Sequence, residues 1–119
     1  MTVFGELGAP ATISVNPGTA EPTETRIVVL ARGAGEPITA QDTVGANIAR
    51  TTWDNSVFES TWDIGAPSRI TVSAAPDLTG LVGVPVGSRV VMVQAAGTDA
   101  NGTVVPARAY VIDIDTKLR

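Results

Sequence analysis

Short segments rich in β-branched residues, separated by glycine and proline, make up most of this chain of 119 residues. Six of them have the alternation or the composition of strands. They are RIVVLAR (26–32), DTVGANIARTTW (42–53), VFES (57–60), SRITVSA (68–74), GSRVVMVQAAG (87–97) and ARAYVIDID (107–115). Between the last two, Asn101-Gly102 is a strong hairpin-turn signal. The chain is therefore predicted to fold mainly as strands joined by tight turns.

The alternation within residues 42–53 predicts which side chains of that strand share a face. Val44, Ala46 and Ile48 lie two residues apart, so their side chains are expected on one face. Gly45, in the middle of the strand, predicts a bulge or a close approach of another backbone segment.

Residues 76–82, PDLTGLV, are the one segment that predicts a helix. Leu78, Leu81 and Val82 fall at i, i+3 and i+4, while Gly80 and Gly83 keep the helix short. About six strands, joined mostly by hairpins, indicate an antiparallel sheet that needs a cover on one face. The predicted fold class is α+β: a curved antiparallel sheet of five to six strands wrapped around one short helix.

The N-terminal 25 residues differ in composition from the rest of the chain. Only ATISV (11–15) predicts a strand, and NPGTAEPTET (16–25) has the composition of turns and linkers. We therefore expect residues 1–25 to form an approach segment that tethers the domain or lies along its edge. The domain itself is expected to span residues 26–119.

Composition excludes several kinds of chemistry. The chain has no histidine and no cysteine, which removes His-dependent catalysis, thiolate catalysis, disulfides and zinc knuckles. Its net charge is −4, and the eight basic residues form no run, so nucleic acid is not an expected partner. No phosphate-cradling glycine motif is present, and we expect no cofactor and no metal.

The sequence does not determine the cellular compartment of the protein. No apolar run approaches the roughly 18–20 residues needed to span a bilayer. The first residues, MTVFGELGAP, lack the basic and apolar regions of a signal peptide.

Three segments, in order, resemble a known family. They are DTVGANIARTTWDNSVFESTWDIGAP (42–67), TGLVGVPVGSRVVMV (79–93) and YVIDIDTKL (110–118). Together they resemble the FKBP-type peptidyl-prolyl cis–trans isomerases, nearest to those of actinobacteria, over about residues 26–118. FGELGAPATISV (4–15) resembles the segment before the second unit of tandem versions. The resemblance implies the same fold that the strand count predicts.

The resemblance also implies a function. Isomerases of this family bind a proline in an apolar, aromatic-lined pocket and lower the barrier of about 18–20 kcal/mol around the X–Pro amide. No nucleophile or titrating base is required, and no catalytic side chain is assigned. The implied partners are proline-containing peptides or unfolded proteins, with a neighbouring FKBP-like domain in the native chain. Export or a lipoprotein anchor is implied by the resemblance alone.

Five positions correspond to the substrate-binding pocket of the family. Phe58 matches its phenylalanine, and Glu59 replaces the aspartate beside it. Ile48 stands where the family has a tyrosine, and Ile112 where it has a phenylalanine. The tryptophan at the pocket floor corresponds to Leu78 or its neighbour Asp77.

Most of the aromatic lining is therefore absent, and two functions stay open. The first is a divergent isomerase with weak or substrate-restricted activity. The second is a non-catalytic structural or chaperone-like interaction module with the same fold. Trp53 is interpreted as rim packing, with Trp62 undecided. Asp113 and Asp115, without a third ligand nearby, are interpreted as a solvated strand face.

Overall fold

The structure is a computed structural model that describes residues 2–5, 10–16, 18–65, 67–72, 80–98 and 101–118. Its elements are β1 (Thr2–Phe4), β2 (Thr12–Ser14), β3 (Arg26–Ala31), β4 (Thr43–Thr52), β5 (Phe58–Ser60), α1 (Thr61–Ile64), β6 (Ser68–Thr71), β7 (Arg89–Gln94), β8 (Gly97–Thr98), β9 (Val104–Val105) and β10 (Arg108–Leu118). No helix in these ranges is long and apolar enough to cross a membrane.

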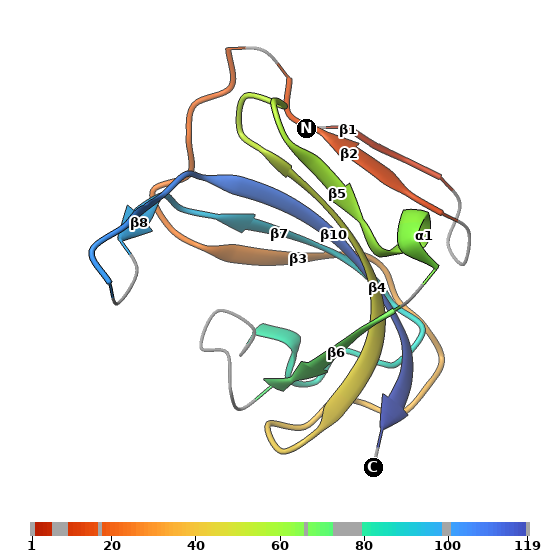
Figure 1. Ribbon diagram of the computed structural model, residues 1–119. Coiled ribbons are helices and arrows are strands. Elements are labelled where there is room, and N and C mark those ends of the chain that lie inside the picture. The colour runs from red at the N-terminus through yellow and green to blue at the C-terminus, as the bar shows by residue number, and fades with distance from the viewer. Residues whose placement is uncertain are drawn as a thin grey trace.

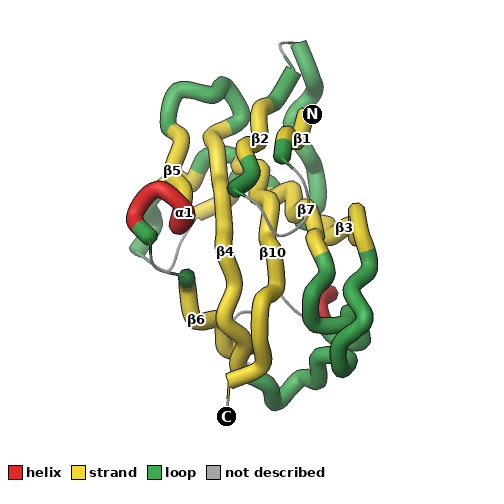
Figure 2. Tube along the Cα trace, turned by 90° about the vertical axis from the view of Figure 1, so that its right-hand side faces the viewer, coloured by secondary structure: helices red, strands yellow, loops and turns green. Residues whose placement is uncertain are grey.

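Six strands form one curved antiparallel sheet (Figure 1). The order is β3-β7-β10-β4-β5, and β6 pairs with the same edge of β4 as β5 does. β5 pairs with residues 49–51 of β4 and β6 with residues 43–46. Figure 2 shows this division: β5 and α1 lie beside one half of β4, and β6 lies beside the other half. The edge of β4 is thus split between two short strands.

The concave face of the sheet carries the larger core. Every second residue of the strands points to this side, as the period of a strand requires. The buried members of this cluster are Ile38, Val44, Ala46, Ile70, Val72, Leu81, Val84, Val90, Met92, Ile112 and Ile114, with Ile48 and Tyr110 packed partly buried against them. The shared face predicted for Val44, Ala46 and Ile48 is confirmed.

The β1–β2 hairpin covers part of the opposite, convex face. A second cluster joins Ala11, Ile13 and Val15 to Ala49, Val91, Ala109 and Val111 of the sheet, and we call it the convex cluster. Asn55 fixes this hairpin to the turn after β4, because its amide accepts from Val15 N at 2.8 Å and donates to Val15 O at 2.7 Å. The segment of residues 11–15 is thus packed on the face of the sheet. The domain boundary at residue 26 stays a prediction.

A buried ion pair lies on the same convex face. Arg89 Nε and Nη2 donate to the two carboxylate oxygens of Asp113 at 2.6 and 2.8 Å, and each side chain is 5% exposed. Arg89 Nη1 also donates to the carbonyl of Gly5, just after β1. The solvated strand face expected at Asp113 is therefore wrong, because the N-terminal hairpin covers that face. Asp115 is exposed, as expected, and accepts from Asn47 Nδ2 at 2.8 Å.

The predicted fold class is confirmed: the sheet has six antiparallel strands and is accompanied by a short helix. All six predicted strands are present, and the Asn101-Gly102 turn joins the paired strands β8 and β9. The β4–β10 register shifts between Ile114 and Thr116, opposite Ala46 and Gly45. The extra residue is therefore Asp115 of β10, so the irregularity predicted at Gly45 is present in the partner strand and not in β4.

The predicted helix over residues 76–82 falls largely outside the described residues, which resume at Gly80 with a 3₁₀ turn. The described α-helix is α1, which the sequence did not predict because four residues show no helical period. Ser60 begins α1 by accepting a hydrogen bond from Trp62 N, and Gly65 ends it in the left-handed conformation at φ 69°.

Candidate functional site

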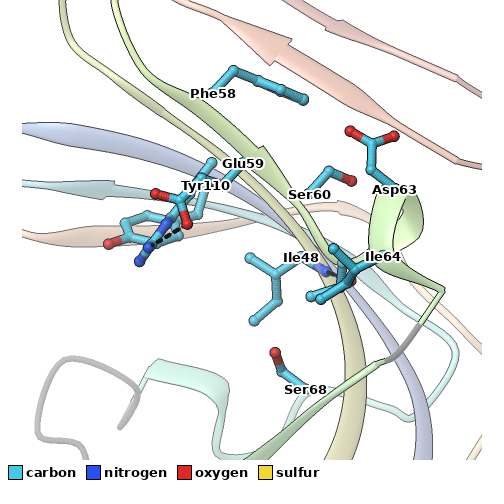
Figure 3. A pocket seen from close by; sticks show the side chains of 10 residues that line it. Ile48, Phe58, Glu59, Ser60, Asp63, Ile64, Ser68 and Tyr110 are labelled. Carbon is cyan, nitrogen blue, oxygen red and sulfur yellow. Dashed lines mark hydrogen bonds and ion pairs between the residues drawn. The ribbon is translucent and has the colours of Figure 1, made fainter.

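A pocket of about 540 Å³ opens where β5 passes into α1. It is lined by Ile48, Arg50, Phe58, Glu59, Ser60, Thr61, Asp63, Ile64, Ser68 and Tyr110. These residues come from five elements: β4, β5, α1, β6 and β10 (Figure 3). The pocket therefore occupies the division between β5 and β6 along the edge of β4.

Thr61, the first residue of α1, holds the helix against this gap. Its Oγ1 accepts a hydrogen bond from Ile48 N at 2.9 Å and donates to Asn47 Oδ1 at 3.0 Å. A side-chain hydroxyl thus replaces a partner strand at this point of β4. This contact orders the backbone at Ile48, whose half-buried side chain faces the concave side.

The two β5 residues singled out from the sequence point in opposite directions. Glu59 is the cross-strand partner of Arg50, whereas Phe58 is the partner of Thr51, so they occupy different faces. Figure 3 shows Glu59 directed toward Tyr110 and Phe58 directed away from both. Phe58 is 41% exposed, so it is not filling the core.

Polar groups surround the concave part of the pocket. Arg50 Nη2 donates to Glu59 Oε2 at 2.8 Å, and this bond raises the pKa of Arg50 above its ordinary value. Tyr110 lies opposite Arg50 on β10 and donates its hydroxyl hydrogen to Gln94 Oε1 at 3.0 Å. Because the Arg50 and Glu59 side chains are 38% and 58% exposed, water screens their attraction. This pair orders the rim and contributes little to stability.

Of the five predicted site residues, the structure brings three together. Ile48, Phe58 and Glu59 all line the pocket. Ile112 is 1% exposed in the concave core and does not line it. Leu78 lies outside the described residues. The role of these residues in binding stays a prediction.

Sequence reasoning missed several lining residues. Arg50 follows Ile48 by two positions on the same strand face, and this period was the available signal. Tyr110 enters through the pairing of β10 with β4, which connects residues 60 positions apart. Ile64 and Asp63 enter through α1, which no periodicity indicated.

Other candidate residues lie elsewhere. Trp53 and Trp62 pack against the convex cluster, and Trp53 Nε1 donates to Thr19 O at 2.9 Å. The rim packing expected for Trp53 is therefore confirmed. Within the described part of the chain, no three His, Cys, Asp or Glu side chains are grouped so that they could hold a metal ion.

The sheet with its split β4 edge, its concave core and this pocket define an FKBP-like fold, and solved structures of that class align with the chain. FkpA from Escherichia coli matches with a TM-score of 0.65 at 19% identity, over 86% of this chain and 52% of that one. The N-terminal domain of FKBP42 from Arabidopsis thaliana matches with 0.63 at 14% identity, over 89% and 99%. A multi-domain immunophilin from Arabidopsis thaliana matches with 0.61 at 14% identity, over 87% and 48%.

The chain thus spans about half the length of the first and third of these proteins. No protein-family model and no curated protein matches its sequence. At these identities the structural likeness shows the fold, and the fold by itself does not define an activity.

Proposed function

We propose that this domain binds X–Pro segments of proteins or peptides in the β5–α1 pocket and catalyses their cis–trans isomerisation slowly. The observation that carries the proposal is the pocket itself. On an FKBP-like fold it gathers Ile48, Phe58 and Glu59, three positions that the sequence resemblance assigns to substrate binding. Its volume of about 540 Å³ is within the range of small-ligand sites, roughly 300–1,000 Å³.

The chemistry suits a chain without histidine or cysteine. Rotation about an X–Pro bond breaks no covalent bond and moves no proton, so it needs neither a nucleophile nor a base. The twisted amide loses its resonance, and a dry apolar surface therefore favours it over the more polar planar state. Ile48 supplies apolar surface on the concave side, Phe58 supplies it on the opposite face of β5, and Ile64 supplies it on α1.

Slow turnover is expected because the lining is only partly apolar and carries few aromatic rings. Ile48 occupies a pocket position where the resemblance predicts an aromatic side chain, and the polar residue Ser68 also lines the pocket. Phe58 and Tyr110 are the two aromatic residues that line the pocket. Open, polar surroundings leave water near the amide, which stabilises the planar state and reduces the rate enhancement.

Exchange NMR on Ala-X-Pro-Phe peptides, with and without the domain, tests the proposal. Cis–trans exchange cross-peaks that appear only with the protein would demonstrate catalysis, and Phe58→Ala should abolish them. Selective broadening without exchange would leave the second candidate function, a non-catalytic interaction module. That candidate is favoured by the sparse aromatic lining.

A matched pair of variants tests the location of binding. Ile64 in the pocket and Val104 in β9 are both highly exposed, at 74% and 76%. Ile64→Ala should weaken peptide binding about 3- to 10-fold, since it removes apolar contact area. Val104→Ala should leave binding unchanged. Equal effects of the two substitutions would place the peptide elsewhere.

Restoring aromatic character provides a gain-of-function test. Ile48→Tyr combined with Leu78→Trp should raise the affinity for X–Pro peptides, because aromatic rings add apolar contact area and specific stacking. Unchanged affinity in a folded variant would count against the assignment of Ile48 to the proline site.

Unfolded proteins that expose X–Pro bonds are the proposed natural partners. We also propose a neighbouring FKBP-like domain in the native chain, since two of the similar structures are about twice as long. Both proposals follow from the fold and the resemblance, and co-purification of the full-length protein with unfolded substrates would test the first.

A further inference from the structure

Three consecutive residues of β5, Phe58, Glu59 and Ser60, all line the same pocket. Side chains of a strand alternate between faces, so a pocket on one face would contact only every second residue. A pocket that contacts all three must extend along the edge of the strand. β5 ends the strand order, and no described strand pairs with its outer edge.

The β4–β5 register determines which backbone groups point to that edge. Thr52 N donates to Val57 O at 3.1 Å, so these two residues form a hydrogen-bonded pair. Hydrogen-bonded and non-hydrogen-bonded pairs alternate along an antiparallel ladder. Glu59 therefore directs its backbone groups inward to Arg50, whereas Phe58 and Ser60 direct theirs outward. Ile48 lies four residues before Thr52 on β4, so the N–H groups of both residues point toward the β5 side of the strand. Ile48 N donates to Thr61 Oγ1 on that side, which agrees with the assignment.

The geometry points to strand addition: an extended X–Pro–Lys/Arg segment binds antiparallel along the outer edge of β5, with its proline opposite Glu59. This inference rests on the proposed function and specifies its binding mode and substrate class. The residue after proline lies opposite Phe58 and exchanges two backbone hydrogen bonds with it. The residue before proline lies opposite Ser60 and accepts from its N–H, since the Ser60 carbonyl belongs to the N-cap of α1.

Proline fits the position opposite Glu59 for two reasons. A residue there directs its backbone nitrogen away from β5, so the missing N–H of proline costs no hydrogen bond. Cross-strand partners share a face, so the proline ring lies on the side of Glu59. That is the concave side, where Ile48 and Tyr110 line the pocket.

Charge and exposure select the residue after proline. It shares the face of Phe58, and Figure 3 shows the exposed Asp63 on the same side, whereas Ile64 is drawn at the level of Ile48, away from Phe58. The Phe58 side chain is 41% exposed. A lysine or arginine covers Phe58 with its methylene stem and places its cation near Asp63. Glu59 is already paired with Arg50, whereas Asp63 has no ion-pair partner among the described residues, so Asp63 supplies the available negative charge of the rim.

Backbone-methylated peptides test the strand addition without changing the protein. The parent peptide is acetyl-Ala-Leu-Pro-Lys-Ala-amide. Methylation of the lysine amide removes the donor opposite Phe58 and should weaken binding about 5- to 10-fold. Methylation of the following alanine amide is the control, because this nitrogen points away from β5, and it should change affinity less than about 2-fold. In ¹H–¹⁵N spectra, the Phe58 and Ser60 amides should shift more than that of Glu59.

Peptide charge tests the substrate class. The lysine peptide should bind several-fold more tightly than its Glu counterpart at low salt, and Asp63→Asn should reduce that preference. Glu24→Gln, which removes an exposed carboxylate outside the pocket, should preserve it. An unchanged preference in Asp63→Asn would refute the assigned position of the basic residue.

The outcomes separate the two proposals. If the peptide binds and Ile64→Ala weakens it, but lysine N-methylation has no effect, strand addition is refuted and X–Pro binding in the pocket stands. If none of the peptides binds, both proposals fail. Parallel addition or a shifted register would be revealed by sensitivity to the alanine methyl group instead, and would also overturn the arrangement described above.

Discussion

Replacing Asp113 with asparagine should destabilise the fold strongly, although Asp113 lies outside the pocket. Its carboxylate accepts two hydrogen bonds from Arg89, at 2.6 and 2.8 Å, and both side chains are 5% exposed. The same contact raises the pKa of Arg89 above its ordinary value. Asparagine keeps the shape but removes the carboxylate charge that faces the buried guanidinium.

The expected cost follows from that burial. Breaking a buried ion pair by neutralising one partner costs about 3–5 kcal/mol. A domain of 119 residues is stabilised by about 6–18 kcal/mol in total, at the usual stability per residue. Asparagine retains one acceptor oxygen, so we expect the lower end, about 3 kcal/mol. At a typical urea dependence this moves the unfolding midpoint down by about 1–3 M.

Tryptophan fluorescence in urea measures this loss, because Trp53 and Trp62 both pack against the convex cluster. Glu59→Gln is the matched control: its ion pair has a similar length, 2.8 Å, but is exposed, and its loss should cost about 0–1 kcal/mol. Equal losses of less than 1 kcal/mol for Asp113→Asn and Glu59→Gln would refute the reasoning. A double variant, Arg89→Met with Asp113→Leu, should be more stable than Asp113→Asn, because no charge stays buried.

Three further predictions concern packing, pH and the hairpin clamp. Gly33→Ala should cost about 1–3 kcal/mol in urea melts, because its Cβ would lie 2.4 Å from backbone atoms, whereas Gly97→Ala meets open space and should be neutral. The pKa of Asp54 is lowered to about 2 by hydrogen bonds from neighbouring hydroxyl and amide groups. Its contribution to stability is thus complete above pH about 4 and is lost as pH falls through about 2, so Asp54→Asn should destabilise at pH 7 and much less at pH 2 in thermal melts. Asn55→Ala should cost about 1–3 kcal/mol and increase amide exchange at Val15, since it removes both clamp bonds and places alanine at φ 61°. Unchanged exchange at Val15 would contradict that role.

The strands and their faces could be predicted from the sequence, because alternation is a local property. Residues two apart in β4 share a face whatever the strand pairs with, so Val44, Ala46 and Ile48 were assigned correctly. The absence of histidine and cysteine likewise restricts the chemistry that the chain can perform, whatever its fold. Resemblance then placed Phe58 and Glu59 at the pocket, although it did not reveal that they face opposite sides of β5.

The tertiary structure determined which distant residues meet, and neither the alternation nor the composition of the sequence could predict this. Tyr110 reaches the pocket because β10 pairs with β4 across 60 residues, and such a register depends on long-range contacts that no local pattern encodes. Asp113 is buried because the β1–β2 hairpin covers one face of the sheet. The alternation of apolar and acidic residues around Asp113 is the same as in a strand whose polar face is exposed to solvent. No described strand pairs with the outer edge of β5, since β6 pairs with the other half of β4 and not with β5. Sequence thus determined which residues form strands and which side each takes, while the pairing of distant strands determined which of them meet.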